Sequence, residues 1–205
     1  MTGVPAVHPR GVVMLLLALA ACAGRRQEGA AAAVSSCEPI EGPLPADVST
    51  APMAGAFRLT MVAITGDSVG RVAEGRLDLR ANDSALVGVR YPGLGDFPDV
   101  TSPYYGSTDV PLGRVGAFQP DGIDSADPLA PGVLVLDRRP RDDAPRITLR
   151  FGTLANRRDA NPLFDGGYTA LRVSWIADTA FGGNWESAVP NRLHSGGYFC
   201  AYRMP

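Results

Sequence analysis

Apolar and polar residues alternate along several short stretches of the chain, a pattern typical of β-strands with one buried face. In residues 56–64, for example, Phe57, Leu59, Met61 and Ala63 fall on one face. The 24 glycines and 18 prolines interrupt the chain too often for long helices. The predicted strands are 56–64, 75–80, 85–91, 132–137, 146–151, 168–176, 181–187 and 197–203, with one further possible strand near 110–118.

This series of strands predicts an all-β fold without a convincing amphipathic helix. Consecutive strands at this spacing favour an antiparallel meander that closes into an eight- or nine-stranded barrel. A β-sandwich is the alternative, because the same alternation fits two packed sheets. The predicted β-barrel domain is 53–205.

A long insertion at 92–132, rich in Pro, Gly and Asp, is expected to be mostly irregular. It carries four aromatic residues that are candidates for ligand binding: Phe97, Tyr104, Tyr105 and Phe118. On a loop at the mouth of a barrel they could line a ligand entrance. They could equally form a plug that buries the insertion.

The N-terminus predicts an address outside the cytoplasm. Arg10 precedes eleven residues, 11–21, without a charged or polar side chain, too short to span a bilayer but suited to a secretory signal peptide. The sequence Leu-Ala-Ala-Cys at 19–22 resembles the bacterial lipobox. That resemblance implies cleavage after residue 21, acylation of Cys22 and anchoring in the lipid bilayer. An ordinary signal peptide with an incidental Cys22 is the alternative.

The residues after the lipobox add to this address. Residues 22–52 are expected to be the lipidated cysteine and a flexible tether. Ala23 is not Asp, which resembles lipoproteins of the outer membrane if the source has two membranes. The chain lacks lysine, and removing 1–21 leaves 18 basic against 21 acidic side chains, about −3. Nucleic acid is therefore not an expected partner. Separately, the protein is expected to be a monomer.

With Cys22 assigned to lipid, Cys37 and Cys200 remain, and an even pair in an oxidising compartment predicts one disulfide. Two free buried thiols are the alternative.

Gly55-Ala56-Phe57 at the first strand, with Arg203 in the last, resembles the lipocalin arrangement of Gly-x-Trp and a late arginine packing over it. Phe57 replaces the tryptophan, and the literal Gly-x-Trp, at 183–185, lies near the other end of the chain. The resemblance implies a lipocalin-like barrel that holds one small apolar ligand.

Catalytic and metal chemistry find little support. Residues 66–70 match Gly-x-Ser-x-Gly, and Ser68 with His194 would be a hydrolase pair. However, a strand pattern follows Ser68 where a nucleophile elbow needs a helix, and Asn191 stands where a related esterase motif has aspartate. His194 is the only histidine after the leader, so no metal site or cofactor is expected.

Arginine clusters at 138–141 and 157–158 are interleaved with aspartates and are expected to be solvated turns; contact with anionic lipid or polysaccharide is the alternative.

The leading interpretation is a membrane-anchored, non-enzymatic envelope lipoprotein that binds a small apolar ligand in its barrel. A structural or interaction lipoprotein with a filled core is the second interpretation. A serine hydrolase using Ser68 and His194 is the third.

Overall fold

The computed structural model describes most of the chain from residue 37 onward. The described residues are 37, 42–82, 89–91, 95–97, 100–120, 132–139, 144–152, 168–188 and 195–205. The predicted leader, Cys22 and His194 lie outside them.

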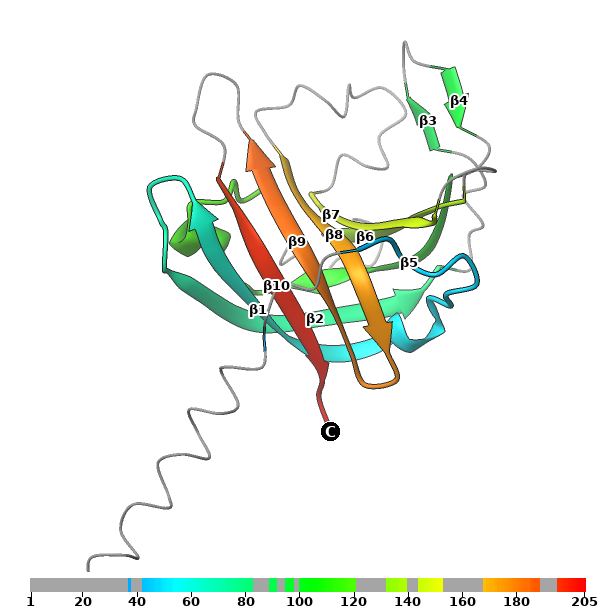
Figure 1. Cartoon of the computed structure of the whole chain (residues 1–205), viewed down its shortest axis with the longest axis horizontal. Helices are drawn as coiled ribbons and strands as arrows, with labels where there is room; N and C mark the ends of the chain where they lie inside the picture. Colours follow the sequence, from blue (N-terminus) through cyan, green and yellow to red (C-terminus); the bar gives the residue numbers. More distant parts are fainter. Residues whose placement is uncertain are drawn as a thin grey trace, which may run out of the picture. The chain divides into compact units, whose positions relative to one another are not determined.

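Eight antiparallel strands form a closed barrel (Figure 1). Barrel strands that follow one another in the sequence are neighbours in the sheet, and the last strand pairs with the first. The barrel strands are β1 (Gly55–Thr65), β2 (Val72–Ala81), β5 (Val100–Thr108), β6 (Val133–Arg138), β7 (Arg146–Phe151), β8 (Tyr168–Ala177), β9 (Ala180–Ala188) and β10 (Ser195–Arg203). The predicted meander barrel is confirmed, and the sandwich alternative is wrong because β1 closes on β10.

Four shorter elements complete the described structure. Strands β3 (Val89–Tyr91) and β4 (Gly95–Phe97) pair with each other in a separate two-stranded sheet. Two 3₁₀ helices, η1 (Ala51–Met53) and η2 (Leu112–Val115), lie just before β1 and just after β5.

The insertion at 92–132 is where the sequence-based expectation fails. The strand predicted near 110–118 is wrong, because those residues contain η2, and a full barrel strand, β5, precedes it. The inward positions of β5 are Ser102, Tyr104, Gly106 and Thr108, so its buried face shows no apolar alternation. Prolines are tolerated at strand irregularities, and Pro103 lies in a register shift between β5 and β6.

The inward faces of the eight strands meet in one apolar core. Phe181 is central to it, with its ring edge-on to two other phenylalanine rings at centroid distances of 5.0 and 6.3 Å. The fully buried core side chains of the barrel include Phe57, Leu59, Met61, Leu77, Val133, Val135, Leu149, Leu171, Phe181 and Phe199.

One end of the barrel, here the η1 end, is closed by residues next to the chain termini of the domain. Met53, in η1, is fully buried at this end. The Arg203 guanidinium donates hydrogen bonds to the carbonyl oxygens of Ala54 (2.9 Å) and Pro52 (2.7 Å) and lies 5.0 Å above the Phe57 ring. Gly55 has φ +125°, and a Cβ there would lie 2.6 Å from that guanidinium. The predicted packing of Arg203 over Phe57 is confirmed.

The opposite end, here the η2 end, is closed by residues 109–120. Leu112 and Val115 insert with no exposed surface. The Ser195 hydroxyl donates to the Gly116 carbonyl oxygen at 2.6 Å. The segment therefore plugs the barrel through both apolar contact and hydrogen bonds to strand hydroxyl groups.

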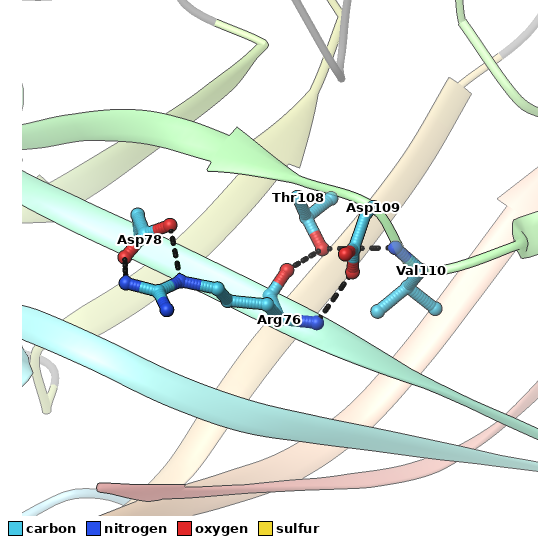
Figure 2. A network of polar contacts seen from close by, with 5 residues as sticks. All are labelled: Arg76, Asp78, Thr108, Asp109 and Val110. Carbon is cyan, nitrogen blue, oxygen red and sulfur yellow. Dashed lines mark hydrogen bonds and ion pairs between the residues drawn. The ribbon is translucent and has the colours of Figure 1, made fainter. Parts of the chain in front are cut away.

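A polar network fixes the chain where it leaves β5 for this plug (Figure 2). The Asp109 carboxylate accepts a hydrogen bond from the Arg76 backbone N–H, and the Thr108 hydroxyl donates to the Arg76 carbonyl oxygen at 2.7 Å. The Arg76 side chain in turn pairs with Asp78 on the same strand. The network joins β2 to the first residues of the plug.

The segment before β1 packs on the barrel. The predicted disulfide between Cys37 and Cys200 is present, with a Cα–Cα distance of 5.6 Å across 163 residues. Leu44 is buried, and Arg139 donates hydrogen bonds to the carbonyl oxygens of Ala46 and Val48. The described part of the expected tether, residues 37 and 42–52, thus belongs to the same compact unit as the strands.

Candidate functional site

The interior of the barrel offers little room for a ligand among the described residues. Its central side chains have zero accessible surface, so a water-sized sphere cannot touch them from outside or from an internal void. Met53 closes one end and Leu112 the other. The described part of the barrel therefore has a filled core.

The four aromatic candidates for ligand binding do not gather on one surface. Tyr104 and Tyr105 are adjacent on β5 and point to opposite faces, and Tyr104 packs against the core. Phe118 lies in the plug, where its N–H donates to the Ser187 hydroxyl (2.7 Å) and its carbonyl oxygen accepts from Thr169 (2.6 Å). The side chain of Phe97 lies outside the described residues. Phe118 thus belongs to a plug.

Ser68, the candidate nucleophile, lies in the turn between β1 and β2. It is only 7% exposed, and its hydroxyl faces Gly116 of the plug, where an added Cβ would lie 2.9 Å away. A strand follows the turn, as expected. The other member of the pair, His194, and Asn191 lie outside the described residues.

The described residues include neither a cluster of metal-ligating side chains nor a membrane-spanning helix. No group of three His, Cys, Asp or Glu side chains is placed to hold a metal ion there. Nor does this part of the chain include a helix long and apolar enough to cross a membrane.

A hollow of about 900 Å³ lies on the outer wall of the barrel across β6 to β9, and is here called the wall groove. Residues 42–44 lie along it, and the outward positions of β7 and β8 contribute Thr148, Ala170 and Ser174. It is defined by residues 42–44, 100, 136, 138, 144–148, 150, 168, 170, 172–174 and 184–186.

The wall groove carries a local excess of positive charge. Its described lining includes four arginines and one acidic residue, Glu186, giving +3 by subtraction, whereas the whole chain is −2. Glu186 forms an ion pair with Arg172 at 2.7 Å. Burial, followed by the nearby Glu186 carboxylate, raises the pKa of Tyr168 above its ordinary value.

The sequence-based reasoning did not predict the groove, although its residues on β7, β8 and β9 lie on predicted strands. Arg138 was expected in a solvated turn, with contact with anionic lipid or polysaccharide as the alternative, and it is instead the last residue of β6. The outward positions read simply as the polar half of each alternation. Only the strand register shows that Arg150 and Arg172 are diagonal neighbours on β7 and β8.

Comparisons with known proteins give little further guidance. No protein-family model matches the chain, and no curated protein matches it. The chain is similar to a solved structure, that of EF1p2_mFAP2b bound to DFHBI, with 11% sequence identity and a TM-score of 0.35. The match covers 76% of this chain and 96% of that one. At such identity and TM-score it carries no argument about function, and the barrel assignment stands on the strand pairing.

Proposed function

We propose that the protein is a membrane-anchored, extracytoplasmic lipoprotein that acts as an interaction scaffold, without enzymatic activity, through the outside of a filled barrel. The observation that carries this proposal is the packed interior. A carrier needs a cavity, and pockets for small ligands usually have about 300 to 1,000 Å³. The wall groove, which has a volume of that size, lies on the outside of the barrel.

The anchor is supported by the lipobox-like sequence at 19–22 and by the disulfide. A bridge between Cys37 and Cys200 is typical of proteins that fold in oxidising compartments outside the cytoplasm. It also accounts for two of the three cysteines, which leaves Cys22 for the lipid. Two or more acyl chains on Cys22 would hold the protein at the bilayer.

A small apolar ligand inside the barrel is the alternative. It requires the plug, residues 109–120, to leave the η2 end, which would expose Leu112 and Val115 and break the hydroxyl bonds that hold the segment. The filled interior favours the scaffold over this carrier.

Native mass spectrometry of the full-length protein, released gently from detergent, separates the two functions. The scaffold predicts a mass equal to residues 22–205 and their lipid alone. A stoichiometric apolar molecule that survives purification, and whose loss exposes the plug to hydrogen exchange, would instead establish a carrier.

The anchor is tested separately by metabolic labelling with palmitate and by detergent phase partition. Wild-type protein should take up label and enter the detergent phase, whereas Cys22→Ser should do neither. Cys37→Ser serves as the matched control and should still be labelled. Equal labelling of wild type and Cys22→Ser would refute the lipid assignment.

A further inference from the structure

We propose that the wall groove binds a soluble, small-molecule polyanion that carries at least two phosphate or carboxylate groups. The proposal rests on the proposed function in one respect, that the barrel acts through its outer wall. It names the chemical class of ligand for that wall.

The first observation is the arrangement of the cations. Arg138 and Arg146 are directly opposite each other on β6 and β7. Arg146 and Arg150 are both diagonal neighbours of Arg172 on β8, because Thr148 lies opposite Arg172. Like charges at these positions on neighbouring strands repel one another, so an anion bound among the guanidinium groups reduces their electrostatic repulsion.

The second observation is that the surrounding protein does not share this charge. The lining is +3 within a chain whose net charge is −2. Arg138, Arg146 and Arg150 have other contacts within the protein, so the argument concerns the density of positive charge and not free guanidinium groups. A guanidinium has five N–H donors and can serve an internal partner and a ligand together.

The third observation is the chemistry of the lining. Arginine presents a planar fork that matches phosphate and carboxylate oxygens two at a time. Between the arginines lie the short side chains of Thr148, Ala170 and Ser174, which leave room above the floor of the groove. Thr148 brings a hydroxyl group, whereas the Ser174 hydroxyl donates to the Gly182 carbonyl oxygen at 3.5 Å. Such a floor suits the oxygens of a polyanion better than an apolar chain.

The shape favours a soluble small molecule over a bilayer. The groove is concave, and residues 42–44 lie along it while β9 contributes Asn184 and Glu186. A volume of about 900 Å³ is within the range of small-molecule sites. A flat membrane surface would meet the rims of the groove before its floor.

The role of Glu186 gives the proposal its sharpest consequence. Its carboxylate is bound to Arg172 at 2.7 Å and occupies a place that an anionic ligand would take. Glu186→Gln removes this competitor and one negative charge. Polyanion affinity should therefore rise about threefold, whereas loss of any arginine should lower it.

The test is isothermal titration of the full-length protein with inorganic tripolyphosphate and with citrate, at low and high ionic strength. Wild type should bind at least one of them, more weakly as salt is raised. Arg146→Gln/Arg172→Gln should lose about tenfold or more in affinity, as expected for charge-assisted hydrogen bonds. The matched control is Arg58→Gln/Arg80→Gln on β1 and β2, which removes two exposed arginines from other strands and should leave affinity unchanged.

Several outcomes would overturn the proposal. One is absence of binding to both probes at low salt; another is an equal loss in the control pair, which would indicate only diffuse charge. Binding to phosphatidylglycerol vesicles without binding to either soluble probe would assign the wall to the membrane. Circular dichroism confirms that each variant is folded.

Failure here is distinguishable from failure of the proposed function. If mass spectrometry finds no internal ligand and the titrations show no binding, only the ligand class proposed for the wall groove is wrong. If an apolar molecule co-purifies while the polyanion still binds, the scaffold proposal falls and the groove remains.

Discussion

The two ends of the barrel are closed by different chemistry. At the η1 end an exposed guanidinium, Arg203, reaches two carbonyl oxygens of the segment that precedes β1. At the η2 end neutral hydroxyls of Thr169, Ser187 and Ser195 hold an internal segment, and these groups are buried. Both ends also insert an apolar side chain, Met53 or Leu112.

From this difference we expect that exposure of a hydrogen bond to water matters more for stability than the charge of its donor. Water competes for the bonds of an exposed guanidinium and can replace them when they are lost. A buried N–H or carbonyl oxygen that loses its partner cannot find water and bears the full cost of desolvation. The neutral η2 end should therefore be the more sensitive to loss of one polar side chain.

The largest effect is expected from the disulfide, which ties Cys37, in the segment before β1, to Cys200 in β10. Cys37→Ala/Cys200→Ala should lower the free energy of unfolding by about 2 to 5 kcal/mol, because the unfolded chain loses a constraint on a long loop. Urea denaturation measures it, with oxidised wild type as the reference. A change below about 1 kcal/mol would mean that the barrel holds this segment without the bridge.

The next largest effects are expected from Met53 and Leu112, the apolar side chains that close the two ends, and they allow a matched comparison. Met53→Ala and Leu112→Ala each remove a fully buried side chain and should cost about 2 to 5 kcal/mol. Hydrogen exchange should show faster opening at the mutated end first. Equal acceleration at both ends would indicate that the barrel opens only as a whole.

A smaller loss is expected from Ser187→Ala, about 1 to 3 kcal/mol. The substitution leaves the Phe118 N–H without its acceptor at the η2 end. The direct readout is exchange of the Phe118 amide, which should become faster while amides of β1 keep their rates. Ala188→Ser, which adds a hydroxyl to the next residue, is a control expected to leave that amide unaffected.

The smallest effect is expected from Arg203→Met, about 1 kcal/mol, because its hydrogen bonds are exposed and its contact with the Phe57 ring is modest. Arg203→Lys should restore part of it. Thermal unfolding gives the order of the variants. A loss for Arg203→Met larger than that for Ser187→Ala would reverse the comparison of the two ends.

The sequence predicts strands well where their inward faces are apolar. Residues 56–64 and 146–151 alternate cleanly and match β1 and β7. β5 escapes prediction because small and polar residues face inward at Ser102, Gly106 and Thr108. The pair Val110 and Leu112 imitates a strand, although Gly113 and Gly116 belong to the turn that forms η2 and its end.

Closure and the candidate site are beyond what alternation can predict. A barrel differs from a sandwich only through the pairing of β1 with β10, a contact between the two ends of the domain. Likewise, Arg150 and Arg172 become neighbours through the β7–β8 register, which depends on the connection between them. By contrast, the disulfide was predictable, since an expected oxidising compartment and the expected acylation of Cys22 leave Cys37 and Cys200 as one pair.

The pairing of β1 with β10 has a consequence for how the chain is made. The first barrel strand synthesised must wait for the last one, so its hydrogen-bonding edge stays open until residue 203 is available. A chain cut short before β10 would expose the edges of β1 and β9 and a thiol at Cys37 together. Open edges invite aggregation. An incomplete chain would therefore differ from the finished protein by its open strand edges and its free thiol.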